Sequence, residues 1–269
     1  QVVVTDKDLA GNTVSSTLNY TLDTTAPTLD QTTSAVTGDT WVVSYADMGS
    51  GFSSELPATS NFTVTVYSNA DVTKPTIVSV TSVRIDASNQ QIILTLASAV
   101  QSGDTVQVVY TPGSGTNLKD VAGNVLAATT FSASQVINKT APAELLNITS
   151  MSGDSGSSAT DFITNDGTSG KVVTGTISSA LRTGEVLQVS FNGGATWQTA
   201  TTNGTSWTAT DSSGHTGNWT IQGKVVSSTN INGAVATQAV LYNATLEASP
   251  TLSLTTDSGT SGDKITNSA

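Results

Sequence analysis

The chain has 269 residues, and twenty acidic against nine basic side chains give it a formal net charge of −11. Such a surface repels nucleic-acid phosphates and anionic membranes, which argues against both as partners. The chain has no cysteine, which excludes disulfides, and no run of about 18 apolar residues that would insert into a membrane as a helix.

Short runs of alternating apolar and polar residues recur along the chain, bounded by Gly, Asn, Asp or Pro. The clearest are residues 63–67, 91–96, 105–110, 186–191 and 219–226. A period of two places one face of a strand on a core and the other in water, so each run predicts a strand. Helical periodicity is almost absent. The predicted fold class is therefore all-β, with the strand spacing of sandwiches.

Three internal repeats organise the chain. Asp-Leu-Ala-Gly-Asn at 8–12 recurs as Asp-Val-Ala-Gly-Asn at 120–124, and Asp-Thr-Thr-Ala-Pro at 23–27 recurs as Asn-Lys-Thr-Ala-Pro at 138–142. The Asp-Ser-Gly and Ile-Thr-Asn pattern of 154–165 recurs at 257–267. Repeats of this kind indicate tandem modules.

The repeats predict four segments in an extended array. They are the last strands of a partial Ig-like module (1–26), two complete Ig-like β-sandwiches (27–141 and 142–248) and the start of a further module (249–269). We expect the chain to be a window from a longer array.

These motifs carry a family resemblance. The run that ends in Ala-Gly-Asn at 10–12 and leads to 23–27, and the whole of 142–248, resemble bacterial Ig-like modules of giant RTX-type surface adhesins. Residues 27–141 resemble a SwmB-type repeat, through Asn-Phe-Thr-Val-Thr-Val at 61–66 and Gly-Asp-Thr-Val at 103–106. The resemblance implies type I secretion, an extended stalk at the bacterial cell surface, Ca²⁺ between or within modules, and roles in adhesion and biofilm.

The residues themselves also favour Ca²⁺, which takes oxygen ligands from carboxylates, amides and carbonyls. Asp6, Asp8 and Asn12 share one Asp-rich loop, and Asp23 lies at the module exit, where Pro27 stiffens the chain. We expect Asp6, Asp8 and Asp23 to converge on one ion at this joint. The alternative for each side chain is an ordinary turn residue that bonds its own backbone.

The candidate Ca²⁺ ligands are the acidic and amide residues of the repeated loops: Asp6, Asp8, Asn12, Asp23, Asp120, Asp154, Asp161, Asp166, Asp257 and Asp263. The exits differ in charge, because Asn138 replaces the linker aspartate at the second exit and Asn-Ala-Thr at 243–245 replaces Asp-Thr-Thr at the third. The joint near residue 26 is therefore predicted to bind Ca²⁺ best and the one near residue 248 worst.

The sequence gives little indication of a catalytic site. His215 is the single histidine, and the glutamates are scattered over different modules, so neither a triad nor a carboxylate pair is indicated. The four tryptophans are predicted to pack in cores, with a sugar-stacking face as the alternative.

The prediction is a structural spacer of a secreted bacterial surface adhesin, not an enzyme, whose partners are the neighbouring modules of the same chain. Two alternatives stay open. One is a module that binds glycans or a host surface, and the other is a subunit of an extracellular filament or sheath.

Overall fold

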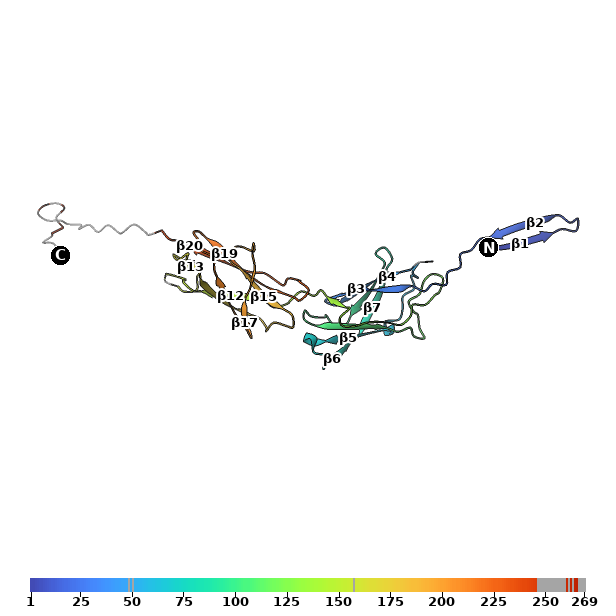
Figure 1. Cartoon of the computed structure of the whole chain (residues 1–269), viewed down its shortest axis with the longest axis horizontal. Helices are drawn as coiled ribbons and strands as arrows, with labels where there is room; N and C mark the ends of the chain where they lie inside the picture. Colours follow the sequence, from blue (N-terminus) through green and yellow to red (C-terminus); the bar gives the residue numbers. More distant parts are fainter. Residues whose placement is uncertain are drawn as a thin grey trace.

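The computed structural model describes residues 1–47, 49, 51–156, 158–245, 260, 262 and 264–265. A hairpin and two β-sandwiches follow one another along the long axis (Figure 1). The described residues contain two short 3-10 helices and no α-helix, which confirms the predicted all-β class of tandem sandwiches. None of these helices has the length and apolar character needed to cross a membrane.

The hairpin at the amino-terminal end consists of β1 (Val2–Lys7) and β2 (Thr13–Leu18), which pair antiparallel. Val2 pairs with Leu18 at its open end, and Lys7 pairs with Thr13 next to the turn. Every residue of both strands is exposed, so the hairpin packs on neither sandwich.

The first sandwich has a four-stranded sheet in the order β10-β9-β5-β6 and a five-stranded sheet in the order β11-β3-β4-β8-β7. Its elements are β3 (Thr28–Thr37), β4 (Thr40–Ala46), η1 (Thr59–Asn61), β5 (Phe62–Tyr67), η2 (Ser68–Ala70), β6 (Pro75–Val78), β7 (Val80–Asp86), β8 (Gln91–Leu96), β9 (Thr105–Tyr110), β10 (Thr129–Phe131) and β11 (Ile137–Asn138). The last strand, β11, runs parallel to the first, β3, and the other pairs are antiparallel.

The second sandwich repeats the four-plus-five arrangement, with sheets in the orders β12-β14-β18-β17 and β13-β20-β19-β15-β16. Its strands are β12 (Leu146–Met151), β13 (Ile163–Thr164), β14 (Lys171–Ile177), β15 (Val186–Ser190), β16 (Gln198–Thr199), β17 (Thr201–Asn203), β18 (Ser206–Asp211), β19 (Trp219–Val226) and β20 (Ala236–Tyr242).

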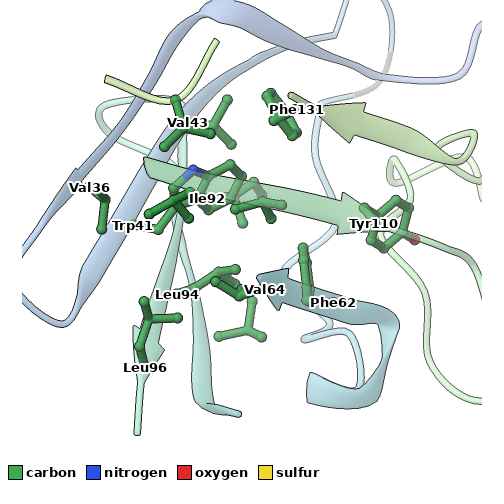
Figure 2. Close-up of a cluster of buried hydrophobic side chains, with 14 of the residues drawn as sticks. Val36, Trp41, Val43, Phe62, Val64, Ile92, Leu94, Leu96, Tyr110 and Phe131 are labelled. Atoms are coloured by element: carbon green, nitrogen blue, oxygen red, sulfur yellow. The ribbon is translucent and has the colours of Figure 1, made fainter. Parts of the chain in front are cut away.

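Each sandwich has its own apolar core, filled by the inward-facing residues of its strands. The burial alternates along β5, β8 and β9 as the sequence predicts for strands with one face on a core. In the first core, Trp41 meets Phe131 edge-to-face with ring centroids 5.1 Å apart (Figure 2). The Tyr110 hydroxyl accepts a hydrogen bond from the Leu118 backbone at 2.9 Å, which satisfies a donor in the connection that follows β9.

Gly175 fills a position in β14 that admits no side chain. A Cβ there would overlap the Asn147 carbonyl oxygen and the Trp207 ring, so the close packing of β12 and β18 on β14 depends on this glycine. We expect Gly175→Ala to destabilise the second sandwich by about 1–3 kcal/mol, the usual cost of overpacking. Urea unfolding measures this cost. Gly217→Ala is the matched control, because its Cβ would meet open space, and equal effects of both changes would contradict the packing argument.

Candidate metal centre

The first joint is the segment of residues 19–27 that connects β2 of the hairpin to β3 of the first sandwich. It lies over a hollow of about 700 Å³ at the end of that sandwich. Asp23, Gly49 and Ala122 are among the residues that line the hollow. The linker, the segment that follows β4 and the loop at 120–124 therefore meet at one place.

The motif loop, residues 120–124 with the repeated Asp-Val-Ala-Gly-Asn sequence, is held by hydrogen bonds between its first and last residues. Asp120 is 1% exposed, and its two carboxylate oxygens accept hydrogen bonds from the Asn124 backbone and side-chain nitrogens, each at 2.7 Å. Gly123 adopts a φ of 98°, a left-handed conformation that glycine enters without a steric cost. The loop thus fixes a buried carboxylate beside the linker.

Asn124 also ties the loop to the linker, because its side-chain nitrogen donates to the Asp23 carbonyl oxygen at 3.1 Å. The Asp23 carboxylate in turn accepts from the Thr25 backbone at 3.0 Å. A Cβ on Gly49 would overlap this carboxylate, so only glycine at position 49 lets Asp23 reach the end of the sandwich.

Asp47, just after β4, supplies a third carboxylate. One ligand oxygen each from Asp23, Asp47 and Asp120 lies within 4.8 Å of the others, and we call these three residues the carboxylate cluster. Asp47 Oδ1 accepts from the Gly49 backbone at 3.2 Å, whereas Oδ2 is buried and has no hydrogen-bond partner among the described residues.

The carboxylate cluster has the chemistry of a site for a hard divalent cation. Two like charges 4 Å apart repel by about 1 kcal/mol in water and about 4 kcal/mol near a protein surface. A cation would remove this repulsion and give the buried Asp47 Oδ2 a partner. Carboxylate oxygens are the ligands that Ca²⁺ prefers, so the donor set fits this ion.

The structure contradicts the expected convergence of Asp6 and Asp8 with Asp23. Asp6 pairs with Val14 near the turn of the hairpin, whereas the linker leaves from its open end. At about 3.3 Å per strand residue, the two places are roughly 13 Å or more apart. The motif loop that meets Asp23 belongs to the following sandwich instead, as the bond from Asn124 shows.

The loop at 8–12 has the same internal bonds as the loop at 120–124. Asp8 accepts from the Asn12 backbone and side chain, each at 2.8 Å, and Gly11 has a φ of 92°. These hydrogen bonds from Asn12 hold the pKa of the Asp8 carboxyl below its ordinary value. At this position the turn alternative accounts for every bond that the structure places on Asp8.

Asp154, Asp161 and Asp166 do not form one cation site in the described part of the chain, where the carboxylate cluster is the single group of three such ligands. Asp154 and Asp161 each accept a backbone hydrogen bond at 3.1 Å, from Phe162 and Ile163. Asp166 instead pairs with the buried Lys171 at 2.8 Å. Hydrogen bonds from Lys171 and then Thr168 lower the Asp166 pKa well below its ordinary value. Asp257 and Asp263 lie outside the described residues.

The aromatic residues lie mostly in the cores. Trp41, Trp207 and Trp219 are 1%, 2% and 8% exposed, which leaves them no face for a sugar ring. Trp197 is half-buried, with the Lys224 ammonium 4.1 Å from its ring centroid. His215 stacks on Trp219 and bonds to Asp211 at 2.7 Å, so it closes the end of the second core.

The sequence contained part of this site. It pointed to Asp23 and Asp120 but missed Asp47, which lies outside every repeated motif. The one local signal is the aspartate that follows the alternating run of β4 two residues before Gly49.

Comparison with known proteins finds one family in part of the chain. Residues 22–115 match the family described as a putative flagellar system-associated repeat. This match supports the SwmB-type repeat predicted for 27–141, and its first residues include Asp23 of the carboxylate cluster. No curated protein matches the chain.

Solved structures show remote similarity. The N-terminal part of the bacterial S-layer protein SbsC has 16% identity and a TM-score of 0.31, over 80% of this chain and 44% of that one. The fibronectin(III)-like modules of Clostridium thermocellum CbhA have 12% identity and a TM-score of 0.34, over 84% of this chain and 100% of theirs. The chain thus spans less than half of the S-layer segment.

Proposed function

We propose that the chain is a spacer segment of a bacterial cell-surface protein, in which β-sandwich modules follow one another and Ca²⁺ stiffens the first joint. The observation that carries this proposal is the composition of the carboxylate cluster. Asp23 comes from the linker, and Asp47 and Asp120 come from the body of the sandwich. A cation held by all three would fasten the linker to the sandwich.

The rest of the molecule agrees with a mechanical role. The modules are arranged in line, and the antiparallel strands along each sheet resist separation through their hydrogen bonds (Figure 1). A net charge of −11 keeps a long chain soluble and discourages association with itself. The resemblance to RTX-type adhesins and the repeat family matched at 22–115 support a structural role at the cell surface, and we propose adhesion as that role.

Small-angle scattering and thermal unfolding of this chain, in Ca²⁺ and then in chelator, test the proposal. We expect chelator to shorten the maximum dimension and to lower the unfolding temperature of the first sandwich, because the three carboxylates would repel without the ion. A Mg²⁺ sample separates a specific effect from ionic strength. An unchanged dimension and unfolding temperature in chelator would remove Ca²⁺ from the mechanism.

A further inference from the structure

At the second joint, residues 139–145 between β11 and β12, an arginine side chain supplies the positive charge. Arg182, in the connection from β14 to β15, extends its guanidinium to the 101–104 loop of the first sandwich. There Nε donates to the Ser102 carbonyl oxygen, Nη1 donates to Gln101 Oε1 at 2.9 Å and Nη2 pairs with Asp104 Oδ1. We call these contacts the Arg182 clamp.

Contacts within each sandwich hold the residues of the Arg182 clamp in place. Asp104 is 7% exposed, and its two oxygens also accept from the Asn69 and Gln101 backbone nitrogens at 2.8 and 2.9 Å. On the other side, Glu185 accepts from the Arg182 backbone at 2.8 Å. Charge-assisted bonds between such prearranged groups are stronger than those between neutral groups.

Further bonds between the sandwiches surround the Arg182 clamp. Thr183 donates from its backbone to Asn69 Oδ1 at 2.6 Å and from its hydroxyl to the Asn69 carbonyl at 3.0 Å. A Cβ on Gly103 would lie 2.8 Å from Arg182 Cβ, so glycine is needed for the two loops to approach this closely. The interface is thus built on both sides of the joint.

The two joints share one backbone plan and differ in charge. At the first, Asn124 donates to the Asp23 carbonyl, and at the second the Thr229 hydroxyl donates to the equivalent Asn138 carbonyl at 2.7 Å. The first joint brings three carboxylates together. At the second joint the equivalent residue, Asn138 at the end of β11, has an amide side chain, which donates to the Gln101 and Asp104 carbonyls at 2.7 and 3.0 Å.

We propose that Arg182 does at the second joint what a bound metal ion would do at the first, and that it locks the two sandwiches into one rigid unit without any metal. The positive charge comes from the chain and is permanent, because a guanidinium stays protonated in proteins. This inference does not depend on Ca²⁺ binding at the carboxylate cluster. It predicts that chelator leaves the second joint as rigid as it is in Ca²⁺.

The absence of cysteine allows clean site-specific spin labelling. One label pair, at Thr63→Cys and Thr210→Cys, reports on the second joint, and another, at Ser16→Cys and Thr63→Cys, reports on the first; all three positions are exposed. Double electron–electron resonance gives the distance distribution of each pair in Ca²⁺ and in chelator. For the second joint we expect one narrow distance distribution that is the same in Ca²⁺ and in chelator.

Arg182→Ala should broaden the second-joint distribution about twofold in both solutions, because modules move independently unless their interface holds them. Arg84→Ala is the matched control, since Arg84 makes one exposed ion pair with Asp86. Arg182→Lys should restore the narrow distribution only in part, since an ammonium group lacks the planar set of donors that a guanidinium presents. A narrow distribution in Arg182→Ala, or broadening of the unchanged chain in chelator, would overturn the inference. The first-joint pair separately shows whether Ca²⁺ acts at the carboxylate cluster.

Discussion

Replacing Trp41 by alanine is expected to destabilise the first sandwich by about 3–5 kcal/mol, the cost of removing a large buried aromatic side chain. Trp41 is 1% exposed, packs edge-to-face on Phe131 and donates from its indole nitrogen to the buried Ser34 hydroxyl at 2.9 Å. The substitution leaves a cavity between the sheets and an unpaired hydroxyl. Because a domain is stable by only about 5–15 kcal/mol, this loss is a large share of the total.

Calorimetry of the Trp41→Ala variant would show the effect as a selective shift. The two cores are separate clusters, so we expect the first sandwich to melt about 10 °C or more lower while the second keeps its unfolding temperature. Trp197→Ala is the matched control, because Trp197 is half-buried and stands outside both cores. Equal shifts of both transitions would show that the sandwiches unfold together.

The second large effect is expected at Asp47. Asp47→Asn keeps the oxygen that accepts from Gly49 and removes the negative charge, to which Oδ2 contributes without a hydrogen-bond partner among the described residues. The substitution should therefore abolish stabilisation by Ca²⁺ with little damage to the loop. For an extracellular module with a Kd of about 10⁻⁴–10⁻³ M, about 10 mM Ca²⁺ stabilises by about 1.4–2.7 kcal/mol. In chelator, Asp47→Asn should equal or exceed the unchanged chain in stability, because one repulsive charge is gone.

Isothermal titration with Ca²⁺ and urea unfolding in Ca²⁺ and in chelator measure these two effects. Asp39→Asn is the matched control, an exposed aspartate of the same sandwich whose one side-chain bond is to the neighbouring Thr40. If the Asp47→Asn variant bound Ca²⁺ as tightly as the unchanged chain does, the ion would bind elsewhere.

The strands were predictable because period-two alternation reports directly on burial. The runs at 63–67 and 105–110 correspond to β5 and β9, which pair with each other and place Val64 and Val108 in the core. The internal bonds of the motif loops also follow from local sequence, since aspartate and asparagine bond to nearby backbone and glycine accepts a positive φ.

The partners of these loops were not predictable, because they depend on which end of a sandwich each loop occupies. Asp23 lies in the same module as the 8–12 loop by sequence, yet it meets the 120–124 loop in space. The sequence around Asp47 and Arg182 indicated even less about the contacts of these two residues. One is a lone aspartate after a strand, and the other is a lone arginine in a polar turn, and each acquires its role from residues far away in the chain.

The bond from Asn124 to the Asp23 carbonyl also bears on how such an array grows by gene duplication. At each joint a side chain of the sandwich that follows donates to a carbonyl of the segment ahead of it, as the bond from Thr229 to Asn138 repeats. A duplicated sandwich would rebuild this bond only if the segment that carries the accepting carbonyl were duplicated with it. The Arg182 clamp sets a further condition at the second joint, because Gln101 and Asp104 belong to the upstream sandwich. A copied sandwich would therefore be held rigidly only behind a neighbour that carries a matching 101–104 loop.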